Sequence, residues 1–167
     1  MPGFTNADAA LSIRSARASE LPSLTELCLR SKAYWGYDGD FIEACRAEFA
    51  IAPAELHTSA IAVAEVSGAP AGMAQVRIED GTCDLLKLFV EPAQIGRGVG
   101  VALFDWAVAQ GRSCGASKMT IESDPNAEPF YRRMGARTVG AAPSGSIPGR
   151  ALPLLELALS AVPEREG

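Results

Sequence analysis

The sequence lacks any apolar run of the roughly 20 residues that a membrane-spanning helix requires. It also lacks the basic start and apolar stretch of a secretory signal, so we expect residues 1–10 to be a loosely ordered lead-in. Residues 161–167 are expected to form the tail of the same single 167-residue domain. These absences predict a cytoplasmic protein without a membrane partner.

The sequence has no excess of basic residues. Lysine and arginine total 15 against 20 aspartate and glutamate residues, which gives a net charge of −5. Because nucleic-acid phosphates are bound by clustered lysine and arginine, this balance argues against a nucleic-acid partner. It is compatible with a cationic acceptor.

Cysteine and histidine are too sparse and too scattered to form a zinc site. His57 is the single histidine, and no two cysteines form a Cys-x-x-Cys pair. We therefore predict no metal, and reduced thiols that pack in the core or lie on the surface. The four cysteines are Cys28, Cys45, Cys83 and Cys114.

The chain does contain a regular alternation of short strands and helices. Turn signals at 67–70 and 80–81 predict an antiparallel meander in the middle of the chain. A strand, a glycine loop, a helix and another strand follow in the segment 83–122, so these two strands should lie parallel across a crossover. The predicted fold is a mixed α/β (α+β) domain whose mostly antiparallel sheet is flanked by helices. Strands are expected at 11–16, 60–66, 71–79, 83–90, 118–122, 137–141 and 151–159, and helices at 20–31 (N-cap Ser19), 41–49 (N-cap Asp40), 99–111 and 127–134.

The most informative segment is Gln94-Ile95-Gly96-Arg97-Gly98-Val99-Gly100. Glycines at alternate positions let backbone N–H groups approach a ligand closely, and the following helix adds positive charge at its N-terminus. This combination suits a phosphate or pyrophosphate; the alternative is a tight turn without a ligand. The two familiar nucleotide loops do not fit, because no Lys-Ser or Lys-Thr follows the glycines and Val101 stands where the dinucleotide fingerprint needs glycine.

The loop resembles the Gln/Arg-x-x-Gly-x-Gly/Ala loop of the GNAT acetyltransferase superfamily, with Gly98-Val99-Gly100 matching its second half. The preceding Leu88-Phe89-Val90-Glu91-Pro92 resembles the end of the family's fourth strand. The resemblance implies that the loop amides cradle the pyrophosphate of acetyl-CoA, and that the strand pairs with the pantetheine arm. The family's leading Gln or Arg falls on Ile95, with Gln94 one place early. The implied cofactor-binding residues are Leu88, Phe89, Val90, Ile95, Gly96, Arg97, Gly98, Val99 and Gly100.

A second motif lies in the segment 126–136. Its spacing from Asn126 to Tyr131 and on to Gly135 resembles the family's Asn-x-x-x-x-x-Tyr-x-x-x-Gly-Phe segment. The resemblance implies that Tyr131 protonates the leaving thiolate and that Asn126 meets the pantetheine arm, with Phe130 beside the cofactor. The alternative is that Phe130 and Tyr131 are core aromatics of an amphipathic helix.

An amine nucleophile must lose a proton, because an ammonium group has no lone pair. Part of the family uses a carboxylate early in the fourth strand, and that position is Asp84. Alternation along a strand places residues 84, 86, 88 and 90 on one face, which would put Asp84 beside apolar neighbours. Glu122 is the alternative base, a third option is water, and Asp84 could instead be a plain hairpin-edge residue.

Two segments are candidates for binding the acceptor. Trp35 and Tyr37 lie between the first two helices, where aromatic rings could hold a cation or plug the edge of the sheet. Ser146 and Arg150 lie in the loop between the last two strands, where Arg150 could bind a carboxylate.

Together these residues predict an acetyl-CoA-dependent N-acetyltransferase that acts on the amine of a small molecule. Transfer is expected to be direct, in a ternary complex, because no cysteine or serine has an evident base. The alternatives are acetylation of a protein N-terminus or lysine, and a non-catalytic acyl-CoA sensor. A homodimer is compatible with the sequence.

Overall fold

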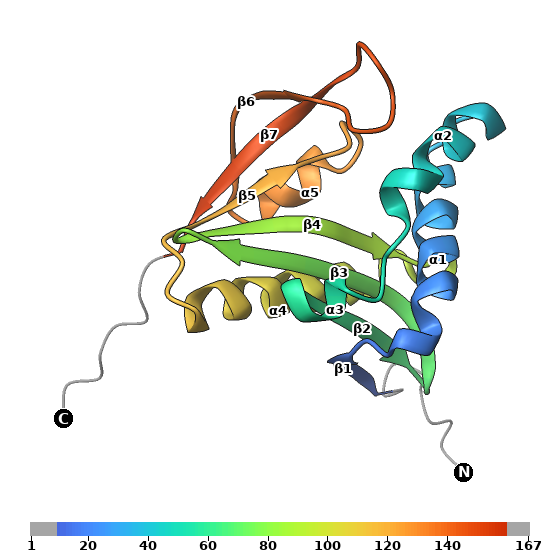
Figure 1. Cartoon of the computed structure of the whole chain (residues 1–167), viewed down its shortest axis with the longest axis horizontal. Helices are drawn as coiled ribbons and strands as arrows, with labels where there is room; N and C mark the ends of the chain where they lie inside the picture. The colour runs from blue at the N-terminus through green and yellow to red at the C-terminus, as the bar shows by residue number, and fades with distance from the viewer. Residues whose placement is uncertain (1–9, 160–167) are drawn as a thin grey trace.

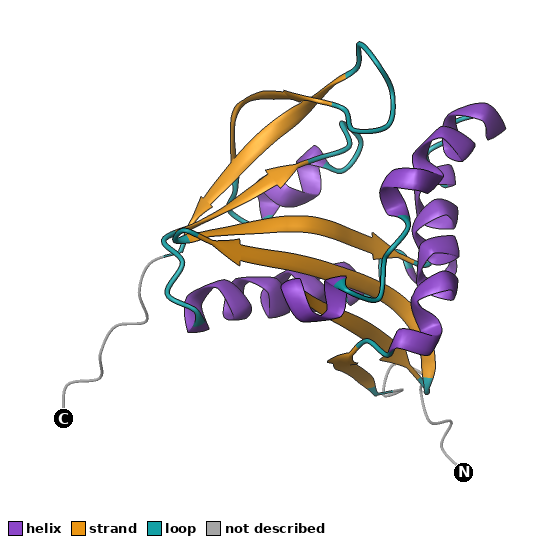
Figure 2. Cartoon of the chain, viewed as in Figure 1, coloured by secondary structure: helices purple, strands orange, loops and turns teal. Residues whose placement is uncertain are grey.

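A seven-stranded sheet with the strand order β1-β2-β3-β4-β5-β7-β6 forms the centre of the structure, a computed structural model that describes residues 10–159 (Figure 1). Helices α1 to α3 cover one face of the sheet, and α4 and α5 cover the other (Figure 2). The strands are β1 (Leu11–Ser15), β2 (Ala60–Val66), β3 (Ala69–Glu79), β4 (Thr82–Val90), β5 (Lys118–Glu122), β6 (Arg137–Pro143) and β7 (Ala151–Ala158). The helices are α1 (Leu21–Ala33), α2 (Gly39–Phe49), α3 (Glu55–Thr58), α4 (Val99–Ser113) and α5 (Glu128–Arg133), with 3₁₀ turns at Ala18–Glu20 and Pro92–Gln94. The predicted mixed, mostly antiparallel fold is confirmed.

The meander β2–β3–β4 turns at two short loops whose residues adopt positive φ. Ser67 and Gly68 have φ of 54° and 81°, and Asp80 and Gly81 have φ of 51° and 76°. Two consecutive positive φ angles give the turn whose twist matches that of the flanking strands, and Asp-Gly is a favoured pair for it. Both hairpins therefore form where the sequence predicts them.

The crossover from β4 to β5 is the only parallel pairing recorded between described strands. Thr82–Leu85 pairs in parallel with Lys118–Ile121, and α4 connects the two strands. Pairing stops at Leu85 and Ile121, although β4 continues to Val90, so the two strands diverge (Figure 1). The divergence leaves one edge of β4 free of β5 at residues 86–90.

A β-bulge divides β4 at the point where the strands diverge. Val76 of β3 pairs with Leu85, but the adjacent Gln75 pairs with Lys87, so Leu86 is the extra residue. An extra residue reverses the alternation of side chains along the rest of the strand.

The reversal corrects one prediction. Before the bulge Cys83 and Leu85 pack with residues of α4, whereas after it Leu88 and Val90 pack on the α4 side. The expectation that residues 84, 86, 88 and 90 share one apolar face is therefore wrong. Asp84 lies on the opposite face of the sheet from Leu88 and Val90.

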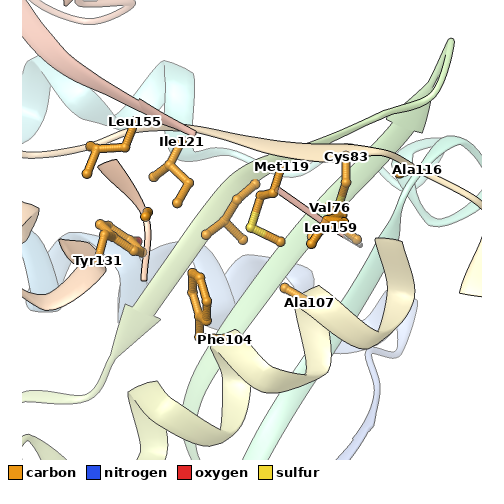
Figure 3. Close-up of a cluster of buried hydrophobic side chains, with 12 residues drawn as sticks. Val76, Cys83, Phe104, Ala107, Ala116, Met119, Ile121, Tyr131, Leu155 and Leu159 are labelled. Atoms are coloured by element: carbon orange, nitrogen blue, oxygen red, sulfur yellow. The ribbon is translucent and has the colours of Figure 1, made fainter. Parts of the chain in front are cut away.

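The hydrophobic core has a layer on each face of the sheet. One layer joins α1 and α2 to β2 and β3, and the other joins α4 and α5 to β4, β5 and β7. Figure 3 shows part of the second layer, in which Tyr131 lies near Phe104 of α4 and beneath Ile121 and Leu155. Among the cysteines, Cys28, Cys45 and Cys83 are buried and Cys114 is exposed, all as free thiols.

Three local differences from the predicted elements have simple causes. Ser19 lies inside a 3₁₀ turn instead of capping a helix, and α1 begins only at Leu21. The turn is held by the Glu20 side chain, which accepts hydrogen bonds from the Arg17 amide and the Arg14 side chain. Helix α2 is capped by Asp38, whose side chain accepts from the Phe41 amide at 2.8 Å, and not by Asp40. The one-turn helix α3 was not predicted, because four residues are too few for a periodic pattern.

Within residues 10–159, no helix combines the length and apolar character needed to cross a bilayer. The same residues contain no cluster of three or more His, Cys, Asp or Glu side chains placed to hold a metal ion.

Candidate active site

A cavity of about 890 Å³ opens where β4 and β5 diverge. Its walls come from α1 and α2, the free half of β4, the glycine loop at the head of α4, the end of β5, α5 and the β6–β7 loop. Of the residues predicted from sequence, all line it except Tyr37, Arg97 and Val99. Segments far apart in the chain therefore meet at one site.

The glycine loop forms one end of this cavity. Gly96 and Gly98 have φ of 84° and 86°, a backbone conformation that residues with side chains rarely adopt. A Cβ atom built on either residue would meet nothing within 4 Å, so the space above the loop is open to a ligand. The first backbone bond of α4 runs from the Ala102 amide to the Gly98 carbonyl at 3.0 Å. The amides just before Ala102 therefore have no acceptor in the helix, and they suit the oxygens of a pyrophosphate.

The side chains of the loop differ in where they lie. Ile95 lines the cavity and is 39% exposed, so the position of the family's Gln or Arg offers an apolar surface here. Val99 is buried in the core under β3, and Arg97 is exposed; neither residue lines the cavity. The Gln94 Oε1 atom is buried without a hydrogen-bond partner among the described residues.

The free half of β4 forms the floor of the cavity. Leu88, Phe89 and Val90 all line it, and the Val90 amide donates to Ser31 Oγ at 3.3 Å. Because β5 no longer pairs there, the strand keeps main-chain groups available for an extended ligand. This edge and the glycine loop together fit a pantetheine arm that ends in a pyrophosphate.

Tyr131 lies in the fork between β4 and β5, and Phe130 lies beside the loop. Tyr131 is 6% exposed and packs against Phe104, with 5.9 Å between ring centroids, yet it lines the cavity. Burial, and then the charge of Asp124, raises the pKa of its phenol far above the ordinary value, while no hydrogen bond from a described residue lowers it. The hydroxyl therefore stays protonated at neutral pH and can act as a donor. The Phe130 ring lies 3.5 Å from the position of a Cβ built on Gly100.

The two candidate bases lie on the wall opposite α4. Asp84 accepts a hydrogen bond from Thr120 Oγ1 and lies 3.6 Å from the Arg77 guanidinium, measured between Oδ2 and Nη2. Glu122 follows Thr120 two residues later on β5, is exposed and also lines the cavity. Both carboxylates and Tyr131 therefore line one cavity.

A polar network around Asp124 forms the other end of the cavity. The Asp124 carboxylate accepts from Lys32 Nζ, from the Tyr37 hydroxyl at 2.9 Å and from the Asn126 amide at 2.8 Å. Arg150 Nη2 lies 3.6 Å from the same carboxylate and donates to the Tyr37 hydroxyl at 2.7 Å. Burial alone would raise the pKa of Asp124, but the hydrogen bonds from Lys32, Asn126 and Tyr37 and the charge of Lys32 together lower it. We call these five residues the Asp124 network.

The β6–β7 loop closes against α2 through a second contact. Ser146 Oγ donates to Glu48 Oε1, and a Cβ built on Gly145 would lie 2.0 Å from Glu48 Oε2, so the loop backbone lies directly against the end of this side chain. Trp35 lies on the rim of the cavity, 44% exposed and in an edge-on contact with Tyr34 at 5.2 Å.

A family model described as an acetyltransferase (GNAT) domain matches residues 40–144. The chain belongs to the GNAT acetyltransferase family. No curated protein sequence matches it. The sequence prediction of a GNAT acetyltransferase, and hence of an enzyme, is confirmed.

Solved structures of GNAT proteins have the same fold at low sequence identity. PaiA N-acetyltransferase from Thermoplasma acidophilum, in complex with coenzyme A, is 16% identical with a TM-score of 0.72, covering 89% of this chain and 99% of its own. The ribosomal-protein-S18-alanine N-acetyltransferase from Escherichia coli is 17% identical with a TM-score of 0.68, covering 95% and 99%. YncA from Salmonella typhimurium, with its cofactor acetyl-CoA, is 22% identical with a TM-score of 0.64, covering 93% and 99%.

In this GNAT domain, sequence reasoning found the glycine loop and the two motif aromatics but missed the centre of the Asp124 network. Tyr37, Asn126 and Arg150 were chosen as binding residues, yet each of these side chains already has a partner in the network. Asp124 lies two residues after the strand 118–122, and a carboxylate near a strand end was the available signal. Lys32 gave no signal, because it resembles any lysine near the end of a helix.

Proposed function

We propose that this protein moves an acetyl group from acetyl-CoA to the amine of a small molecule by direct transfer in a ternary complex. Acetyl-CoA would lie along the free edge of β4, with its pyrophosphate on the amides from Gly96 to Val101. The open space above Gly98 and the divergence of β4 from β5 support this placement. Three solved GNAT neighbours were crystallised with CoA or acetyl-CoA, which also supports the donor.

The observation that carries the proposal is that the same cavity is lined by a protonated phenol, Tyr131, and by the two candidate bases, Asp84 and Glu122. Bound acetyl-CoA supplies the thioester carbonyl carbon that the amine attacks. Asp84 would take the proton that the amine must lose, with Glu122 as the alternative base. Tyr131 would give its proton to the sulfur as the carbon–sulfur bond breaks, so that CoA leaves as a thiol. The new bond is the amide between the acetyl carbon and the amine nitrogen.

Direct transfer is supported by the burial of the one cysteine that lines the cavity within the described residues. Cys45 is the only cysteine among the described residues that line the cavity, and it is buried in the core beneath α2. A thiol acts as a nucleophile as its thiolate, which needs a nearby cation or base to form. With the acid and a base already facing the same space, an acyl-enzyme would add a step that these residues do not require.

A small acceptor is supported by the way the β6–β7 loop meets α2. The contacts of Ser146 with Glu48 and of Arg150 with Tyr37 bring that loop against the α1–α2 region beside the cavity. A cavity bordered by both contacts suits a compact amine. The exposed Trp35 of the cavity lining and its neighbour Tyr34 favour the second candidate, a protein N-terminus or lysine, because aromatic side chains are common at protein interfaces.

Thiol release from acetyl-CoA tests the proposal when it is followed with a panel of small amines and of peptides with free N-termini or lysines. We expect turnover with at least one small amine and intersecting double-reciprocal plots when both substrates are varied. Parallel plots would replace direct transfer by an acyl-enzyme, and turnover confined to peptides would favour the protein acceptor. Tight CoA binding without turnover of any amine would favour the acyl-CoA sensor.

A further inference from the structure

Lys87 differs from the other cations that line the cavity. Lys32 and Arg150 pair with Asp124, Arg77 pairs with Asp84, and Arg133 is exposed to solvent. Lys87 is 9% exposed, and within residues 10–159 no carboxylate lies within ion-pair distance of it. Its recorded hydrogen bond runs from Nζ to the neutral Oε1 atom of Gln75, at 3.2 Å.

The Gln75 amide is held in the orientation that offers its oxygen to Lys87. Its Nε2 donates to Glu55 Oε1 at 2.9 Å and to Ser59 Oγ at 3.0 Å, so Oε1 must point the other way. Gln75 is fully buried and is the cross-strand partner of Lys87. These hydrogen bonds therefore position the Lys87 ammonium group, and Gln75 lies between it and the Glu55 carboxylate.

The negative charge of Glu55 reaches Lys87 only through the Gln75 amide that lies between them. Burial would raise the pKa of Glu55, but the Gln75 hydrogen bond, the Ala52 amide and the charge of Lys87 together lower it, so the carboxylate stays ionised. An ammonium group has three N–H donors, and a buried charge is costly unless it is paired directly. Lys87 uses one donor on Gln75, and the residue is one of those that line the cavity.

The position of Lys87 suits the substrate side of the cavity. It directly follows the bulge residue Leu86 and lies three residues after the candidate base Asp84 on the same strand. The cavity lining holds five cationic side chains against four carboxylates, although the whole chain carries a charge of −5. An anionic group entering this space meets a buried, oriented cation.

We propose that Lys87 binds a carboxylate carried by a substrate, so that one substrate of the transfer is a carboxylate-bearing molecule such as an amino acid. The inference rests on the proposed function. The carboxylate could belong to the acceptor amine or to a dicarboxylic acyl chain on CoA, so the test includes both kinds of substrate.

The test compares matched substrates that differ only in the carboxylate. Thiol release is measured with L-amino acids against their carboxamides, and with succinyl-CoA against acetyl-CoA. Wild type is compared with Lys87→Met, and with Lys118→Met, which removes one charge from an exposed lysine on β5 that does not line the cavity. Calorimetry of the same substrates measures the preference for the carboxylate independently of turnover. For this measurement the amines are added to protein saturated with CoA.

We expect wild type and Lys118→Met to favour the carboxylate member of one pair by about 10-fold or more in kcat/KM or affinity, the scale of a charge-assisted hydrogen bond. Lys87→Met should lose this preference because KM rises for the substrate that carries the carboxylate. The kinetic constants of the matched substrate without the carboxylate should not change. If Lys87→Met fails to bind CoA, Lys87→Gln repeats the comparison. Equal use of both members by wild type, or a preference retained in the Lys87 variants, would overturn the inference. Absence of turnover with every amine would overturn the proposed function instead, while calorimetry would still decide the role of Lys87.

Discussion

The glycine loop and the Asp124 network border the same cavity but are built from different parts of the chain. The loop is a contiguous segment with open space above Gly96 and Gly98, where Val99 is buried in the core and Arg97 is exposed outside the cavity lining. The network brings together side chains from α1, the α1–α2 loop, the segment after β5 and the β6–β7 loop. A site made of backbone depends on φ angles, whereas a site made of side chains depends on the whole fold.

This difference separates the two substrates of the proposed reaction. The end that would hold acetyl-CoA is insensitive to most side-chain changes, because its ligand groups are amides. The end that would admit the acceptor is defined by charges and hydroxyls that any substitution alters. Variants at the two ends should therefore fail in different ways.

The largest effect is expected from a change in the backbone site. Gly98→Glu adds a side chain at φ of 86° and a negative charge where the pyrophosphate would lie. Both strain and repulsion oppose binding, so CoA affinity should fall by about 100-fold or more. Calorimetry with CoA measures the loss, and circular dichroism checks that the fold is kept.

Gly68→Glu is the matched control for this variant. Gly68 also has positive φ, 81°, with open space at its Cβ, but it lies in the β2–β3 turn and does not line the cavity. Gly68→Glu introduces the same backbone strain away from the cavity, so it should leave CoA affinity unchanged. Equal affinities in both variants would remove the loop from the donor site.

Tyr131→Phe probes the point where the two ends meet. If Tyr131 protonates the leaving sulfur, kcat should fall by about 100-fold, with little change in KM for acetyl-CoA because the lost interaction belongs to the transition state. Stability should change by no more than about 1 kcal/mol, since no described residue hydrogen-bonds the hydroxyl. Steady-state kinetics with a turned-over amine measure the effect, and the exposed Tyr34→Phe serves as control. Full activity would leave Tyr131 as a core aromatic.

The same contrast explains what could be predicted from the sequence. The hairpin turn at Asp80-Gly81, the glycine loop and the parallel crossover follow from local patterns, so they were predicted. The bulge at Leu86 could not be predicted, because one inserted residue is set by how β3 pairs with β4. It was also the feature that overturned the predicted face of Asp84.

The Asp124 network could not be predicted for a related reason. Lys32 and Asp124 are 92 positions apart, and neither belongs to a motif with fixed spacing. Only the packing of α1 against the sheet brings their side chains together. Tyr37 and Arg150 were predicted from the sequence to bind the acceptor, but the partners that hold their side chains come from the tertiary structure.

Asp84→Asn tests the acceptor end with a smaller expected effect. A lost base should lower turnover by about 10-fold or more at pH 7, where a free amine with an ordinary pKa near 10 is mostly protonated. The deficit should narrow toward pH 10, because unprotonated amine becomes plentiful. Glu122→Gln is the matched control, and pH profiles of kcat/KM measure both. A deficit confined to Glu122→Gln would move the role to Glu122, and a deficit in neither variant would assign it to water.

Asp124→Asn should affect the chemistry least and the stability most clearly. The variant removes the carboxylate that pairs with Lys32 and Arg150 and leaves the buried Lys32 without an anion. Breaking such a pair costs about 2–4 kcal/mol at pH 7, whereas Glu156→Gln, which breaks an exposed pair with Lys118, should cost no more than about 1 kcal/mol.

The pH dependence gives this last prediction its sign. The pKa of Asp124 is lowered in the folded protein from an ordinary 3.8, so its contribution to stability is present above that value. It is lost as the pH falls through the folded pKa, because a protonated aspartate, like asparagine, carries no charge for Lys32. Urea denaturation of wild type and Asp124→Asn should therefore give stabilities that differ at pH 7 and approach each other as the pH falls from about 3.8 through the lower folded pKa. A difference that persists in acid, or one no larger than that of Glu156→Gln, would mean that the network is held by its neutral hydrogen bonds rather than by the charge of Asp124.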